Sequence, residues 1–125
     1  MEIVIVIVVL AGFLLILMLS IVYPRYRRDI RRARERVSTG SRIAETSCGP
    51  IEYAVAGEGI PVLVVHGAGG GFDQGLDISM PLVQNGFRLI AMSRFGYLRT
   101  PLPEDASAAA QADAHAALLD ALNVP

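Results

Sequence analysis

The chain has 125 residues, of which 53% are hydrophobic and 18% charged, and its 11 basic and 12 acidic residues leave a formal net charge of -1 at pH 7. This composition excludes a disordered chain and a protein that coats nucleic acid, so no nucleic-acid partner is expected. The single cysteine excludes an intramolecular disulfide bond, and no cysteine or histidine cluster offers a metal site. Lysine is absent, which excludes Schiff-base chemistry and a phosphate-binding P-loop.

The first predicted element is an uncharged apolar run over residues 3–23. As a helix with a rise of about 1.5 Å per residue, this run is roughly 30 Å long and matches the hydrocarbon core of a bilayer. A cleaved secretory signal would have a basic start, a shorter apolar stretch and a small-residue cleavage site, which differs from this run. We therefore predict a retained transmembrane signal anchor over residues 1–23, the alternatives being a cleaved signal and a buried core helix.

A basic segment follows, with eight arginines against two acidic residues between residues 24 and 42. Positive residues beside a span favour the cytoplasmic side, so we expect a single-pass protein of the cell membrane with its N-terminus outside and its globular part in the cytoplasm. Tyr23 and Tyr26 stand where interfacial aromatic residues are expected. The arginines either serve only as a topology signal on a basic juxtamembrane linker or also bind anionic lipid, at about 1 kcal/mol each. The topology rule alone accounts for them.

Residues 38–41 have the composition of a linker, and we place the start of a globular domain near Ile43, so that the domain covers residues 43–125. Strands are predicted at residues 51–56, 60–65 and 87–92, and helices at residues 73–84 and 107–122 with Asp105 or Ser107 as the N-cap. Alternating strands and helices favour the α/β class, with a parallel sheet covered by helices. Two parallel strands and one short edge strand would leave an apolar edge unpaired, which indicates an incomplete sheet.

A glycine-rich loop, HGAGGG at residues 66–71, follows the second predicted strand directly. Such a loop between a buried strand and a helix presents backbone N–H groups that can hold an anion or a developing oxyanion. A dinucleotide site would need the pattern G-x-G-x-x-G, but the third glycine is replaced by Phe72 in one register and by Gln74 in the other. A dinucleotide-binding module is therefore the weaker interpretation, and we expect no cofactor.

The strand and loop sequence PVLVVHGAGGGFDQG, the later sequence GFRLIAMSRFGYLRTP and the Ala/Leu helix ending in ALNVP resemble the N-terminal part of the α/β-hydrolase superfamily. The resemblance covers roughly residues 46–125. It implies an incomplete α/β-hydrolase-like parallel sheet with flanking helices, which here would follow the N-terminal transmembrane helix predicted from the apolar run. It also implies that His66 and Gly67 are the family's His-Gly pair, and that the backbone N–H of Ala68 or Gly69 is an oxyanion-hole donor.

The resemblance further places Arg94 and Gly96 in a substrate-side loop that commonly reads Arg-x-Gly-x-Gly-x-Ser. Leu98 replaces the second glycine of that pattern and Thr100 replaces the serine, which suggests a variant loop. We expect His66 to be a structural residue of its loop. His115 is expected to be a solvated helix residue, because a lone helical histidine with no positioned partner is not a catalytic base.

The family's nucleophile lies in a G-x-S-x-G elbow on the strand after the last predicted helix, and an acid and a histidine follow it. No serine of this chain lies in such a setting, so we assign no catalytic residue and expect the 125 residues alone to be inactive. The first hypothesis is the N-terminal part of a membrane-anchored hydrolase whose full-length form would cleave a small-molecule ester, amide or related bond through an acyl-enzyme.

The second hypothesis is a small, non-catalytic, single-pass membrane protein that serves as a binding or scaffolding module. Its edge strand would be completed by a partner or by homo-oligomerisation. The lipid bilayer is a partner under both hypotheses. No substrate is indicated, because the cap region and late loops that shape the pockets of this family would follow residue 125.

Overall fold

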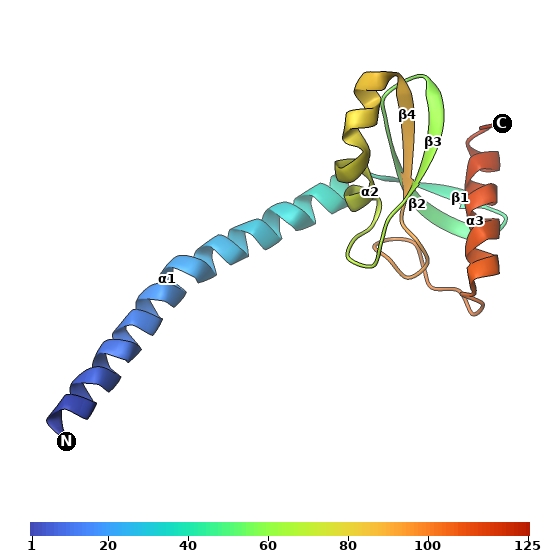
Figure 1. Ribbon diagram of the computed structural model, residues 1–125. Coiled ribbons are helices and arrows are strands. Elements are labelled where there is room, and N and C mark those ends of the chain that lie inside the picture. Colours follow the sequence, from blue (N-terminus) through green and yellow to red (C-terminus); the bar gives the residue numbers. More distant parts are fainter. The chain divides into compact units, whose positions relative to one another are not determined.

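The computed structural model describes all 125 residues, which form two compact units, Met1–Arg36 and Val37–Pro125. The elements follow one another along the chain as shown in Figure 1. Apart from Met1, the first unit lies in helix α1 (Glu2–Thr39), which has no buried residue and ends within the second unit. Val37–Pro125 contains the sheet and the remaining helices.

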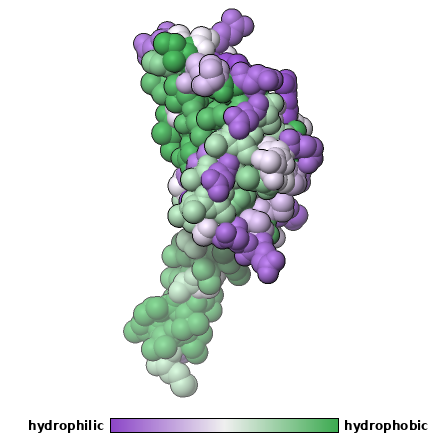
Figure 2. All heavy atoms as spheres, turned by 90° about the vertical axis from the view of Figure 1, so that its right-hand side faces the viewer, coloured by the Kyte–Doolittle hydropathy of each residue, from purple (hydrophilic) through white to green (hydrophobic).

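Helix α1 changes character along its length. Its N-terminal part is a continuous hydrophobic surface (Figure 2) and makes α1 the one helix that is long and apolar enough to cross a membrane. The helix continues beyond residue 23 through the basic segment and ends at Thr39, within the stretch expected to be a linker. Pro24 lies inside the helix and has no N–H to donate to the carbonyl of Ser20 one turn earlier.

Val37–Pro125 is built on a four-stranded mixed sheet with the order β1-β2-β4-β3. Strands β1 (Arg42–Thr46) and β2 (Gly49–Ala56) form an antiparallel pair, and β2 also pairs antiparallel with β4 (Phe87–Met92). Strand β3 (Ile60–Val65) pairs parallel with the other side of β4. The β3–β4 unit is the part of the sheet that the chain connects through a helical crossover.

The α/β class is confirmed, but the expectation of a parallel sheet needs correction because only β3 and β4 run parallel. Strand β1 was not predicted, since its sequence RIAET is polar and none of its residues is buried. Because β1 covers the outer side of β2, β2 is an internal strand and not the short edge strand expected.

The first of the two helices predicted after β3 is split into two segments. The single helix expected at residues 73–84 is an α-helix, α2 (Phe72–Ser79), followed by a 3-10 helix, η1 (Met80–Asn85). Pro81 cannot donate the next α-helical hydrogen bond, which explains the change. Helix α3 (Ala108–Ala121) has Ser107 as its N-cap, since the Ser107 hydroxyl accepts from the Ala110 N–H, and this confirms one of the two predicted N-caps.

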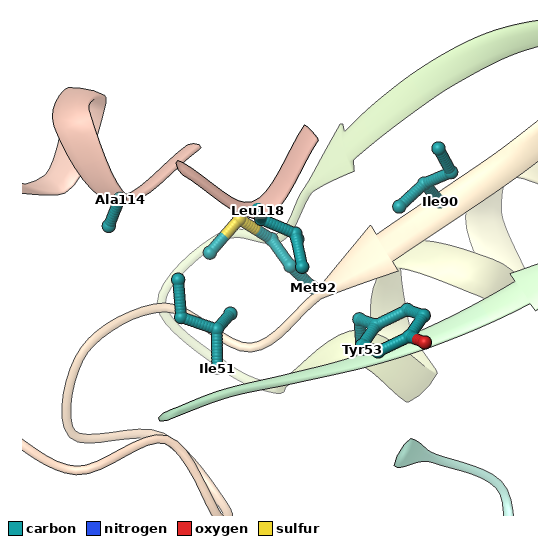
Figure 3. Packing of buried hydrophobic residues seen from close by; sticks show 6 residues of the cluster. All are labelled: Ile51, Tyr53, Ile90, Met92, Ala114 and Leu118. Carbon is teal, nitrogen blue, oxygen red and sulfur yellow. The ribbon is translucent and has the colours of Figure 1, made fainter. Parts of the chain in front are cut away.

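The core has two layers, one on each face of the sheet. On one face α3 packs against alternate residues of β2 and β4, as Figure 3 shows for the cluster Ile51, Tyr53, Ile90, Met92, Ala114 and Leu118. On the other face Phe72 of α2 packs against Ala54 and Ala91. The period-two alternation of strands thus gives each helix its own face, so that α2 and α3 are held on opposite sides (Figure 1).

Candidate functional site

Two loops meet at the carboxyl ends of the parallel strands β3 and β4. Val65 of β3 and Met92 of β4 are register partners, so residues 66–71 (the glycine loop) and residues 94–103 (the arginine loop) begin side by side. The carboxyl ends of parallel strands are where open α/β sheets bind ligands. The expected oxyanion loop and the expected substrate-side loop are therefore adjacent.

His66 joins the two loops. Its ring is buried, with 5% of its surface exposed, and its Nε2 accepts a hydrogen bond of 2.9 Å from the Arg94 backbone N–H. Nε2 is therefore unprotonated, and the ring proton is on Nδ1, which donates to the Gly67 carbonyl at 2.6 Å. The Tyr97 ring meets the His66 ring edge-on at 4.7 Å between centroids. Both ring nitrogens are hydrogen-bonded to backbone groups, so the lone pair on Nε2 is not free to accept a proton from a substrate. His66 is therefore a positioning residue.

The middle of the glycine loop presents free backbone donors. The N–H groups at its two ends are used, since Gly67 donates to Gln74 Oε1 and Gly71 donates to Asp73 Oδ1. The N–H groups of Ala68 and Gly69 make no hydrogen bond within the chain. The Gly70 N–H faces the Gly67 carbonyl across the turn at residues 68–69. Ala68 and Gly69 are also exposed, so their amides are accessible to a ligand.

Close packing explains why this loop needs glycine at its C-terminal end. A Cβ on Gly70 would lie 2.5 Å from the Gln74 Cβ, and a Cβ on Gly71 would lie 2.3 Å from a methyl carbon of Leu98. The arginine loop supplies that methyl group, and its Tyr97 hydroxyl donates to the Ala68 carbonyl at 3.2 Å. The two loops therefore hold each other in place.

Two residues of the arginine loop have a left-handed backbone conformation. Gly96 has a φ of 76° and Leu98 a φ of 48°, both in the left-handed region. A glycine would adopt this conformation without strain, whereas a leucine there costs roughly 1 kcal/mol. Leu98 therefore adopts a left-handed backbone conformation at the position where the resemblance places a glycine.

A buried carboxylate that the sequence analysis did not single out supports this loop. Glu52 of β2 is fully buried, and four hydrogen bonds reach its two oxygens. Oε1 accepts from the Ser41 hydroxyl at 2.6 Å and from Arg99 Nε at 2.8 Å. Oε2 accepts from the Ser93 hydroxyl at 2.9 Å and from the Arg99 backbone N–H at 3.0 Å.

These bonds decide the charge of Glu52. Burial by itself would raise the pKa of the carboxyl, but the bonds from Arg99, Ser41 and Ser93 outweigh burial and hold the pKa below its usual value. Ser93 also accepts from the Phe72 N–H at 3.2 Å, which links the carboxylate to the first residue of α2. The only sequence signal for this network is an acidic residue inside the otherwise apolar strand IEYAVA.

A second group of polar atoms lies beside α3. A cavity of about 470 Å³ is bounded by Val65, by the arginine loop and by α3. Gln111 Oε1 accepts from the Phe95 N–H at 2.9 Å, but Gln111 Nε2 and His115 Nε2 are buried without a partner. Burial, followed by the charge of Arg94, lowers the pKa of His115. His115 is therefore half-buried, with its Nε2 inside the protein, and is not the fully solvated residue that we expected.

The sequence and the structure were compared with those of known proteins. The sequence matches no protein-family model and no curated protein. An α/β-hydrolase fold protein from Nakamurella multipartita has a similar structure over 68% of this chain, with a TM-score of 0.65 and 41% sequence identity. The chain carries part of an α/β-hydrolase fold. Its hydrolase-like residues span 29% of the Nakamurella protein.

Two further structures show how widely the chemistry of similar folds varies. An epoxide hydrolase from an endophytic Streptomyces matches 66% of the chain at 29% identity and a TM-score of 0.58. A thermophilic esterase from Thermogutta terrifontis matches 69% at 28% identity and a TM-score of 0.54. The chain spans 26% and 33% of these two proteins. The fold is therefore common to enzymes that cleave different bonds, and it does not define a substrate.

Proposed function

We propose that the chain is the N-terminal part of a membrane-anchored α/β-fold hydrolase whose glycine loop supplies a backbone donor of the oxyanion hole. The unsatisfied, exposed N–H groups of Ala68 and Gly69 at the end of β3 carry this proposal. Preorganised backbone donors stabilise the negative charge that develops when an ester, amide or related bond is attacked. His66 contributes by fixing the loop against Arg94 before substrate arrives.

In this proposal the nucleophile, acid and base come from further polypeptide that adds a strand beside β3. The Ile60 N–H donates to the Gly86 carbonyl, so Ile60, Val62 and Val64 direct their backbone groups toward β4. The backbone groups of Leu63 and Val65 consequently point to the open edge.

Helix α1 is proposed to anchor the protein as a signal anchor, with the N-terminus outside the cell and Val37–Pro125 in the cytoplasm. The support is its apolar first part and the arginines that follow it. Membrane attachment would place the catalytic part close to the bilayer surface.

The open edge of β3 also favours a second function, in which a partner or a second copy supplies the neighbouring strand and no catalysis occurs. Such a module would use strand addition, with main-chain hydrogen bonds giving affinity. The two functions differ in whether a nucleophile ever reaches the glycine loop.

Labelling by a serine-directed fluorophosphonate tests the proposal. We expect an antibody against Val37–Pro125 to detect, in native membranes, a species heavier than 13.4 kDa that the probe labels, and we expect no label on the purified 125-residue chain. In the heavier species Ala68→Pro removes one donor and should abolish labelling, whereas Ala68→Ser keeps the N–H and should retain it. A covalent label on the purified chain would contradict the proposal, and an unlabelled native species of 13.4 kDa would favour the second function.

A further inference from the structure

We propose that a groove on the basic half of α1 binds the phosphate group of an anionic phospholipid. The proposal rests on the membrane anchoring proposed above and adds to it a lipid site with defined residues. The groove has a volume of about 410 Å³ and is lined by Tyr23, Tyr26, Arg27, Ile30, Arg31 and Arg34.

The arrangement of the groove follows from helical spacing. Arg27, Arg31 and Arg34 are four and three residues apart, so they lie on one side of α1. Tyr23 lies one turn before Arg27, and the guanidinium carbon of Arg27 is 5.8 Å from the centroid of the Tyr23 ring. No acidic residue lines the groove, which therefore combines three positive charges with an aromatic and aliphatic wall.

The chemistry of these side chains matches a phospholipid better than a free anion. A guanidinium group presents a planar fork of N–H donors that fits two phosphate oxygens, and it stays charged at all relevant pH values. The rings of Tyr23 and Tyr26 and the side chain of Ile30 offer apolar surface beside these donors. A phospholipid carries its phosphate next to glycerol and acyl chains, whereas inorganic phosphate has nothing to place on the apolar wall.

The groove also lies at the depth of a lipid headgroup. The apolar run of α1 ends at Tyr23, and at a rise of about 1.5 Å per residue Arg27 lies roughly 6 Å beyond it and Arg31 roughly 12 Å beyond it. The headgroup layer on each side of a bilayer is about 5 to 8 Å thick. Arg27 therefore lies within this layer, and the long side chains of Arg31 and Arg34 reach toward it from the aqueous side.

The remaining arginines provide a matched control. Arg25, Arg32 and Arg36 carry the same charge on the same helix, but they are not among the residues that line the groove. General attraction to a negative membrane surface depends on the number of charges near it. Removing either set of three arginines would weaken general attraction to a similar degree, whereas only the groove set would affect a defined lipid site.

Native mass spectrometry of the full chain from detergent micelles, with added phosphatidylglycerol or phosphatidylcholine, tests the site. We expect the wild-type chain to retain one phosphatidylglycerol in preference to phosphatidylcholine. The variant Arg27→Gln/Arg31→Gln/Arg34→Gln should lose at least about tenfold in this preference, and Arg25→Gln/Arg32→Gln/Arg36→Gln should change it by less than about twofold. Equal losses in both variants, or no loss in either, would overturn the proposal.

Two additional measurements show whether a negative result concerns the lipid site or the membrane anchor. Competition with inorganic phosphate should leave the lipid bound, and displacement of phosphatidylglycerol by inorganic phosphate would mean that the groove recognises the free anion. Extraction of membranes with alkaline carbonate reports anchoring independently of the groove. A chain that is extracted contradicts the proposed anchor, whereas a chain that resists extraction without lipid preference contradicts only the lipid site.

Discussion

At the scale of single residues, Glu52 has the largest expected effect on the candidate site. Its carboxylate accepts bonds from Ser41, Ser93 and Arg99, so the variant Glu52→Gln replaces an acceptor with an amide group that must face one of these donors. We expect the free energy of unfolding of the full chain in detergent micelles to fall by about 2 to 3 kcal/mol, since bonds to a buried charge are lost. Glu58→Gln, at an exposed turn, is the control and should change little.

Glu52 also predicts the acid sensitivity of the fold. The pKa of Glu52 is lower in the folded chain than its usual value of 4.5, so the folded state binds this proton less readily than the unfolded state. The resulting stabilisation is present above about pH 4.5 and is lost as the pH falls through the folded pKa. Chemical denaturation between pH 7 and pH 3 should show a steeper loss for the wild-type chain than for Glu52→Gln. Parallel pH profiles would contradict this role.

His66 gives a second prediction at this scale. The variant His66→Ala leaves the Arg94 N–H and the Gly67 carbonyl without their partners, which should cost about 1 to 3 kcal/mol and free the glycine loop. Hydrogen exchange at the Arg94 amide should become faster. His115→Ala is the matched histidine control, because the His115 Nε2 has no partner to lose. Unchanged exchange at Arg94 in His66→Ala would show that His66 does not hold the loops together.

At the scale of elements, the membrane orientation proposed for α1 can be tested by chemical labelling of the chain's own cysteine. Cys48 is the single cysteine, and it is exposed in the turn between β1 and β2. With Val37–Pro125 in the cytoplasm, a membrane-impermeant maleimide should leave Cys48 unlabelled in intact spheroplasts and label it after permeabilisation. The variant Glu2→Cys/Cys48→Ser should be labelled from outside. Labelling of wild-type Cys48 in intact spheroplasts would reverse the proposed topology.

Elements with a strong local signal were predictable from the sequence, and those that depend on distant partners were not. β3 is a run of apolar, mostly β-branched residues, and the start of α3 is specified by the Ser107 cap, so both follow from neighbouring residues. Strand β1 is a polar segment that is a strand because it pairs with β2. The break between α2 and η1 could have been inferred from Pro81, whose effect on a helix is local.

The candidate site also combines a part that the local sequence predicts with a part that depends on distant contacts. The position of the glycine loop followed from HGAGGG after an apolar strand, which is a local pattern. The contact between His66 and Arg94 links residues 28 positions apart, and the bond between Glu52 and Arg99 links residues 47 positions apart. Both contacts require the strand order β2-β4-β3, which one sequence does not show. For this reason the loop and the structural role of His66 were predicted, but the contact of His66 with Arg94 and the support from Glu52 were not.

At the scale of the whole molecule, the open edge of β3 gives a prediction with an internal control. The N–H groups of Leu63 and Val65 point away from β4, whereas those of Val62 and Val64 point toward it. In the dilute full chain, hydrogen exchange should be at least about tenfold faster at Leu63 and Val65 than at their neighbours, because free amides have no ladder bond to break. Equal exchange along β3 would mean that something already covers this edge.

Raising the chain concentration then separates the proposed hydrolase from that form of the second function in which a second copy completes the sheet. If a second copy completes the sheet, Leu63 and Val65 become protected in step with the formation of a dimer, as measured by light scattering. If further polypeptide of a larger hydrolase completes it, the purified chain keeps these amides unprotected at every concentration, and they are protected only in the heavier native species. Strand pairing protects alternate residues, so the same experiment also distinguishes an added strand from general aggregation, which would slow exchange at all exposed positions together.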